Sequence, residues 1–128
     1  LKKLEMSEDW HYELIKYAED CGIKFLSTGF DESSIDFLVS LNIDLLKVPS
    51  GEITNKPYLE HIGKVAKKVI LSTGMANLEE IRADIYILEK DIKVIMLIEP
   101  SKHTRLSNKT KRNFINAHFP KCKTYSLK

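Results

Sequence analysis

The chain has 128 residues, of which 43% are hydrophobic, and 20 basic and 18 acidic residues give it a formal net charge of +2. This is the length of one ordinary domain, with enough apolar side chains for a core. The longest apolar run, residues 94–98, is far shorter than the roughly 20 residues of a membrane-spanning helix. The first residues also lack the apolar stretch of a signal peptide. We therefore expect a cytoplasmic protein that does not engage a membrane.

The charge is distributed unevenly along the chain. Residues 101–128 contain eight basic residues and no acidic one, so the first 100 residues carry 12 basic and all 18 acidic residues. We predict a body over residues 1–98 and a basic segment over 99–128, which is either a further helix or a disordered end. Aromatic residues do not alternate with these charges, so no nucleic-acid partner is expected. Cys21 and Cys122 form no motif, and reduced thiols are the expectation.

Taken in chain order, the hydrophobic pattern first predicts a helix over 9–22. Its apolar face comprises Trp10, Leu14, Tyr17, Ala18 and Cys21, and Gly22 suits its end. The further predicted elements are a strand over 23–28, a helix over 31–42, a strand over 43–48, a helix over 55–65, a strand over 68–73, a helix over 77–90, a strand over 92–98 and a weaker helix within 109–119.

Local capping signals support these helices. Asp31, Asn55 and Asn77 are predicted N-caps, Glu80 stands at the reciprocal position for Asn77, and Asn42 suits a left-handed stop. The alternation of strands and helices predicts parallel strands joined by crossover helices. A doubly wound sheet and a (β/α)₈ barrel both fit, and a barrel uses about 250 residues for eight units. The absence of a glycine-rich phosphate loop after any strand weakens the nucleotide-binding sheet.

The segment after the strand at 43–48 combines a cation, a hydroxyl, a glycine and an anion. Side chains alternate along a strand, so Lys47 extends the face that carries Ile43 and Leu45. Inside a barrel an unpaired ammonium is costly. Lys47 is therefore a surface lysine or the structural partner of Glu52, or else it binds an anionic ligand with help from Ser50. In the last case Glu52 could move a proton.

Other polar residues carry weaker signals. The two Ser-Thr-Gly segments, 27–29 and 72–74, are explained by ordinary turn chemistry. The four histidines are scattered without the spacing of metal ligands, so the residues predict no metal site.

Three stretches together resemble the N-acetylneuraminate (sialic acid) synthases. They are FLSTGFDESSIDFL at 25–38, LLKVPSGEITNKPYLEHI at 45–62 and VILSTGMANLEEI at 69–81. The resemblance implies an α/β fold, a partial (β/α)₈ TIM barrel of about four β/α units with parallel strands. It also implies an enzyme, a carbon–carbon bond-forming transferase that condenses phosphoenolpyruvate with N-acetylmannosamine and releases phosphate. In the whole family protein it implies a small antifreeze-like domain, a homodimer and a divalent metal, Mn²⁺ or Mg²⁺.

The resemblance also implies roles for individual residues. Lys47, Ser50 and Ser72 match residues that bind phosphoenolpyruvate, and Glu52 matches a catalytic base. Thr28 and Phe30 match residues on the sugar side of the pocket.

The sequence departs from the family pattern in three respects. Gly29 replaces a usual proline, and the polar motif expected after Leu97 is missing, as are the metal-binding histidines. We therefore expect a fragment with little or no activity by itself. The alternatives are a non-catalytic remnant or partner-completed half barrel that binds an anion, and a related nonulosonic acid synthase with another sugar acceptor.

Overall fold

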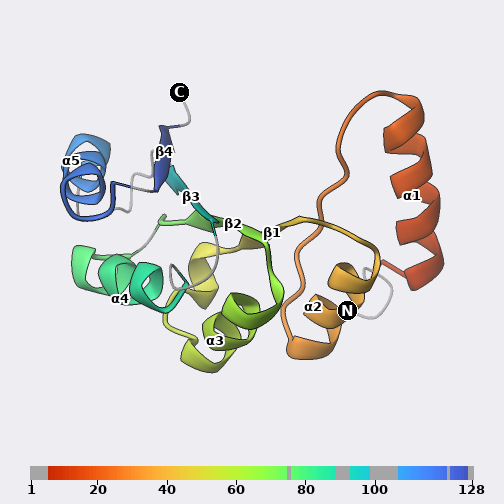
Figure 1. The fold of residues 1–128 in the computed structure, drawn as a ribbon, viewed down its shortest axis with the longest axis horizontal. Coiled ribbons are helices and arrows are strands. Elements are labelled where there is room, and N and C mark those ends of the chain that lie inside the picture. Colours follow the sequence, from red (N-terminus) through yellow and green to blue (C-terminus); the bar gives the residue numbers. More distant parts are fainter. Residues whose placement is uncertain (1–5, 75, 89–92, 99–106, 121, 127–128) are drawn as a thin grey trace.

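The computed structural model describes residues 6–74, 76–88, 93–98, 107–120 and 122–126 (Figure 1). In chain order the elements are α1 (Glu8–Asp20), α2 (Glu32–Ser40), β1 (Leu45–Val48), the short 3-10 helix η2 (Ser50–Glu52), α3 (Lys56–Val65), β2 (Lys68–Ser72), α4 (Leu78–Leu88), β3 (Lys93–Ile98), α5 (Asn108–His118) and β4 (Lys123–Ser126). The predicted end of the helix at 77–90 and the predicted start of the strand at 92–98 lie outside the described residues. The predicted division after residue 98 adjoins residues 99–106, which also lie outside them.

The four strands form one parallel sheet in the order β1-β2-β3-β4. A helix lies between each pair of consecutive strands, as parallel connections require. The register sets Lys47 of β1 beside Ile70 of β2. The predicted α/β class with parallel strands is therefore confirmed.

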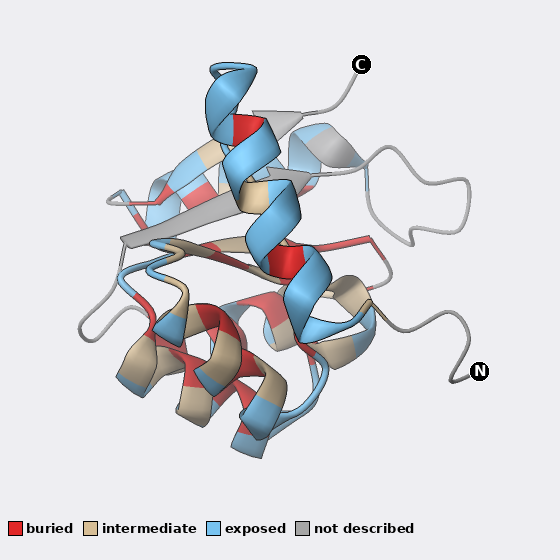
Figure 2. Ribbon diagram, turned by 90° about the vertical axis from the view of Figure 1, so that its right-hand side faces the viewer, coloured by how far each residue is buried: buried red, intermediate tan, exposed pale blue. Residues whose placement is uncertain are grey.

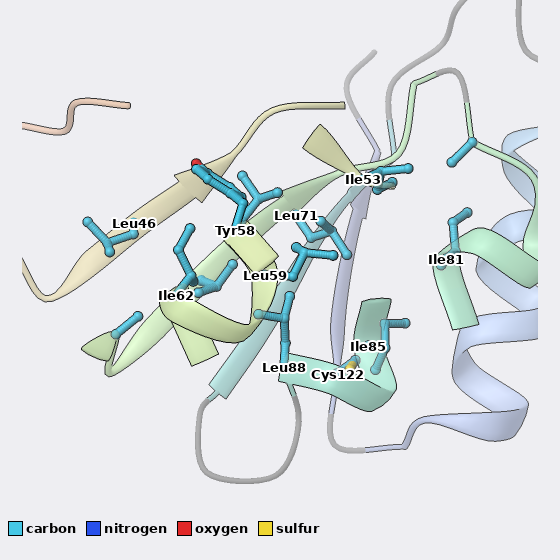
Figure 3. Packing of buried hydrophobic residues seen from close by; sticks show 14 of the residues in the cluster. Leu46, Ile53, Tyr58, Leu59, Ile62, Leu71, Ile81, Ile85, Leu88 and Cys122 are labelled. Carbon is cyan, nitrogen blue, oxygen red and sulfur yellow. The ribbon is translucent and has the colours of Figure 1, made fainter. Parts of the chain in front are cut away.

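The core lies between one face of the sheet and the helices that cover it. Leu46 and Val48 of β1 and Val69 and Leu71 of β2 alternate along their strands and are at most 2% exposed. Figure 1 shows α2, α3 and α4 in a layer on one side of the sheet. Figure 3 shows how side chains of α3 and α4 meet those of the strands, and the same buried cluster includes Ile35, Leu38, Leu59, Ile62, Ile81, Ile85, Leu88 and Ile115.

The predicted caps form. Asp31 accepts a hydrogen bond from the Ser34 N–H at 2.7 Å, and this bond is the main reason why the pKa of Asp31 lies below its usual value. Asn77 accepts from the Glu80 N–H at 2.9 Å, while Glu80 accepts from the Asn77 N–H at 2.8 Å. Asn42 has a φ of 59°, the left-handed conformation expected after α2.

The prediction of a strand over 23–28 is wrong, because these residues form an irregular segment between α1 and α2. A strand needs a hydrogen-bonded neighbour. Here β1 pairs with β2, and residues 23–26 instead line a cavity of about 420 Å³ together with residues 41–45.

The predicted apolar face of the first helix is largely exposed. Trp10, Leu14 and Tyr17 are 60%, 41% and 68% exposed, and the buried side chains of α1 are His11 and Ala18. Figure 1 shows why: α1 stands apart from the layer of helices that covers the sheet. The ring of His11 packs edge-on against the ring of Phe37, with 5.2 Å between their centroids.

Part of the basic segment 99–128 is folded. The weak helix predicted within 109–119 is confirmed as α5, which contributes Ile115 to the core. The strand β4 follows it and was not predicted. Among the described residues, no helix is long and apolar enough to cross a bilayer.

Candidate functional site

The end of β1 places Lys47 on the face of the sheet opposite the main core. Leu46 and Val48 are buried, whereas Leu45 and Lys47, which alternate with them, are half-buried. Pro49 then precedes the tight turn η2, in which the Glu52 N–H donates to the Pro49 carbonyl at 3.0 Å. The turn therefore follows Lys47 directly and carries both Ser50 and Glu52.

Ser72 lies at the end of the neighbouring strand, on the same face as Lys47. Lys47 is in register with Ile70, and Ser72 is two residues further along β2, which returns to the same side of the sheet. Ser72 is 1% exposed. The sheet thus brings an ammonium group and a hydroxyl group to one face at the carboxyl ends of adjacent strands.

Glu52 is half-buried and held by the beginning of α3. Its Oε2 accepts from Asn55 Nδ2 at 2.7 Å, and Asn55 in turn caps α3 by accepting from the Tyr58 N–H at 3.4 Å. Among the described contacts, no ion pair within 4.0 Å joins Lys47 to Glu52. The interpretation of these two residues as a structural pair is therefore not supported.

Thr28 and Phe30 occupy a different position, in the irregular segment before α2. Both line a cavity of about 680 Å³ between α1 and the beginning of α2, and Phe30 is 64% exposed. Lys47, Ser50, Glu52 and Ser72 do not line this cavity. The structure therefore places the predicted site residues in two groups, one at the strand ends and one beside α1.

Tyr58 connects the two groups. Its buried hydroxyl donates to the Gly29 carbonyl at 2.7 Å, between Thr28 and Phe30. Burial, assisted by the nearby charge of Glu52, raises the pKa of Tyr58 to about 12. The hydroxyl therefore remains a proton donor at neutral pH, and it fixes the segment 27–30 against α3.

Three buried polar residues were missed by reasoning from the sequence. His11 Nδ1 donates to the Ser7 carbonyl at 2.9 Å, Lys111 is fully buried, and Asp84 is 3% exposed. Burial, with the charge of Glu80 as a smaller cause, raises the pKa of Asp84 to about 7. For Asp84 the signal was present, because it falls on the stripe of α4 that carries Ile81 and Ile85.

The resemblance implies a divalent metal, and the described residues do not supply a site for one. They contain no group of three or more His, Cys, Asp or Glu side chains that could hold a metal ion.

Comparison with solved structures defines the class of the fold. The spore coat polysaccharide biosynthesis protein SpsE of Bacillus subtilis superposes with a TM-score of 0.82 at 25% identity, over 95% of this chain and 36% of that one. A truncated 3-deoxy-D-arabino-heptulosonate 7-phosphate synthase from Thermotoga maritima gives a TM-score of 0.67 at 18% identity and supports the fold alone. The chain thus shares the α/β architecture of these solved structures.

The sequence comparisons identify the family. The model of the NeuB family matches residues 1–109, so the chain belongs to the NeuB family. It is 56% identical over 85 residues to the N,N'-diacetyllegionaminic acid synthase of Legionella pneumophila, and 40% identical over 81 residues to the human N-acetylneuraminate-9-phosphate synthase. These matches cover 66% and 63% of this chain but only 24% and 23% of the relatives. The matched region thus corresponds to about a quarter of their length.

Proposed function

We propose that the chain is part of a nonulosonic acid synthase that condenses phosphoenolpyruvate with N-acetylmannosamine to give N-acetylneuraminate and phosphate. The observation that carries the proposal is the placement of Lys47 and Ser72 on one face at adjacent strand ends, with η2 directly after Lys47. An ammonium and a hydroxyl in this arrangement suit a phosphate or carboxylate group. We also propose that the four parallel strands are part of a (β/α)₈ barrel, in which this face points inward.

Each residue has a role in the proposed reaction. Lys47, with Ser50 and Ser72, holds the anionic phosphoenolpyruvate, while Thr28 and Phe30 line the sugar side. C3 of phosphoenolpyruvate attacks the aldehyde carbon of the open-chain sugar, and the C2–C3 π pair forms the new carbon–carbon bond. The C=O π pair moves onto the aldehyde oxygen, which takes a proton from solvent, and C2 is left electron-deficient.

The second half of the reaction involves Glu52. Water adds to the electron-deficient C2 and gives one proton to Glu52. The bond from C2 to the phosphate oxygen then breaks with its electron pair on the phosphate, while the new C2 hydroxyl passes its proton to the leaving phosphate and becomes the ketone oxygen. Asn55 holds Oε2 of Glu52 at 2.7 Å and so orients its carboxylate. Because such groups act as a unit, we expect the 128-residue chain alone to bind phosphoenolpyruvate with little or no turnover.

A second acceptor sugar is supported by a specific observation. Two relatives named N,N'-diacetyllegionaminic acid synthase, from Legionella pneumophila and Campylobacter jejuni, are 56% and 53% identical to this chain, against 40% for the human N-acetylneuraminate-9-phosphate synthase. Their product carries two acetamido groups. Phosphoenolpyruvate contains no nitrogen, so both groups must come from the sugar. A diacetamido hexose is therefore the alternative acceptor.

The proposal is tested first by binding. Titration calorimetry of the chain with phosphoenolpyruvate should detect binding, and Lys47→Ala should weaken it by about tenfold or more because a charge-assisted contact is lost. Lys64→Ala is the matched control, since Lys64 is an exposed lysine in the last turn of α3. Equal affinities for the two variants would contradict the role of Lys47.

Turnover is tested by phosphate release with phosphoenolpyruvate, Mn²⁺ and either N-acetylmannosamine or a diacetamido hexose. In a chain that turns over, Glu52→Gln should retain binding and lose most of the rate, because glutamine still accepts from Asn55 but takes no proton. Unchanged turnover would overturn the role of Glu52. Binding without turnover in the unmodified chain would favour a non-catalytic remnant or a half barrel completed by a partner.

A further inference from the structure

The two Ser-Thr-Gly segments share a structural feature that turn chemistry does not explain. A buried side chain donates to the main-chain carbonyls of each segment. Tyr58 Oη reaches the Gly29 oxygen at 2.7 Å, and Lys111 Nζ reaches the Thr73 oxygen at 2.6 Å and the Gly74 oxygen at 3.5 Å. Tyr58 is 3% exposed and Lys111 is fully buried.

The two contacts also have the same place in the topology. From residues 27–29 the chain runs through α2 and β1 to α3, which carries Tyr58. From residues 72–74 it runs through α4 and β3 to α5, which carries Lys111. In both cases the donor belongs to the second helix after the segment. The same contact, from a buried side chain to a main-chain carbonyl, therefore recurs two β/α units later along the chain.

The choice of lysine at position 111 has a physical consequence. A buried ammonium group is costly unless its N–H donors are satisfied, and an apolar side chain would fill the same space without that cost. Thr73 and Gly74 are themselves buried. The contact of Lys111 with their carbonyls therefore fixes the orientation of the segment where it leaves β2.

That orientation determines where the neighbouring N–H group points. The described residues contain no cis peptide bond, and in a planar trans peptide the N–H points opposite to the C=O. Because the Thr73 carbonyl points at Lys111, the Gly74 N–H points away from it. Ser72, two residues before Gly74, lies on the face that carries Lys47.

We propose that Lys111 is a positioning residue for an anion site formed by Ser72 and the Gly74 N–H. Lys111 does not touch the anion, but it holds the segment 72–74 so that a hydroxyl and a main-chain donor are presented together. This inference rests on the proposed function, because the anion in question is the phosphate or carboxylate group of phosphoenolpyruvate. It assigns a role to a residue beyond the part of the chain that the family model matches, residues 1–109.

The test compares three variants of the 128-residue chain by titration with phosphoenolpyruvate and with inorganic phosphate. Lys111→Met keeps most of the side-chain length without donors and should weaken binding by about tenfold, whereas Lys111→Arg, which keeps donors and charge, should recover part of the loss. Tyr58→Phe is the matched control, because it removes the equivalent buried donor from segment 27–29. It should change phosphate affinity less than about twofold.

A measurement on the unmodified chain keeps the test decisive if Lys111→Met does not fold. In a phosphate titration followed by amide NMR, the Gly74 N–H should be among the most strongly shifted resonances. An unshifted Gly74 amide at saturation, or phosphate affinity equal in Lys111→Met and the unmodified chain, would overturn the inference alone. Absence of any binding of phosphoenolpyruvate by the unmodified chain would instead contradict the proposed function.

Discussion

The helices α1 and α3 are both amphipathic, yet they are used differently in the structure. α3 buries Tyr58, Leu59 and Ile62 against the sheet and its neighbouring helices. α1 buries only His11 and Ala18 among its side chains and exposes Trp10 and Tyr17 to solvent. Figure 2 shows most of the α1 ribbon in the colour of exposed residues. Hydrophobic periodicity therefore indicates that a helix has an apolar face, but the burial of that face depends on a partner surface.

The same contrast holds for the segments beside the two helices. Residues 45–48 and 23–28 are both short stretches that combine apolar side chains with a lysine. The first pairs with β2 and becomes a strand, whereas the second faces a cavity and remains irregular. A substitution in the packed region and one in the α1 region should therefore have very different effects on stability.

The largest effect is expected from a core truncation in the packed region. Leu71 is fully buried, and Leu71→Ala should lower the free energy of unfolding by about 2–5 kcal/mol. Leu14→Ala in α1, where the side chain is 41% exposed, should cost about 0.5 kcal/mol or less. Urea denaturation followed by circular dichroism measures both values. Similar losses for the two variants would show that α1 is packed in solution.

The next effect concerns a polar side chain within the packed region. Asp84 Oδ2 is buried without a hydrogen-bond partner, and the pKa of Asp84 is raised from 3.8 to about 7. The folded state therefore binds the proton more tightly than the unfolded state, so stability should fall as pH rises from about 4 to 7 and stay low above 7. The shift corresponds to an upper limit of about 4 kcal/mol.

Asp84→Asn removes this titration and should stabilise the chain at pH 8 while changing it little at pH 4. Thermal melts at the two pH values measure the difference. Glu79→Gln, an exposed change in the first turn of the same helix, is the control and should not show this pH dependence. A pH-independent effect of Asp84→Asn would contradict the burial of a protonated carboxyl.

A smaller effect is expected where the two regions meet. A Cβ atom at Gly29 would lie 3.0 Å from the Ile35 nitrogen and from two Ser34 atoms, so the backbone at the start of α2 would have to shift. Gly29→Ala should therefore cost about 1–3 kcal/mol. Gly51, whose added Cβ would meet nothing within 4 Å, provides the control variant Gly51→Ala. Equal stability of the two variants, measured by urea denaturation, would contradict the close approach.

The smallest effect is expected from an ion pair on the surface of the packed region. His61 Nε2 and Asp36 Oδ1, from α3 and α2, are 2.7 Å apart, with the Asp36 side chain 61% exposed. Asp36→Asn should cost no more than about 1 kcal/mol in urea denaturation. A loss as large as that of Leu71→Ala would mean that this contact, rather than apolar burial, joins the two helices.

The sequence by itself determined the elements whose causes are local. The caps at Asp31 and Asn77 and the left-handed Asn42 depend on residues within a few positions, so their signals were complete in the sequence. Alternation along 43–48 likewise placed Lys47 on the face opposite Leu46, which the burial pattern confirms. The roles assigned to the site residues stay predictions.

Only the tertiary structure decided which surfaces were covered and which polar groups were enclosed. The failure of 23–28 to pair, the exposure of Trp10, and the contact of Lys111 with a carbonyl 38 residues away depend on segments distant in sequence. Burial and strand pairing are properties of two surfaces brought together. A single segment carries the pattern for one surface but does not specify whether the other is present.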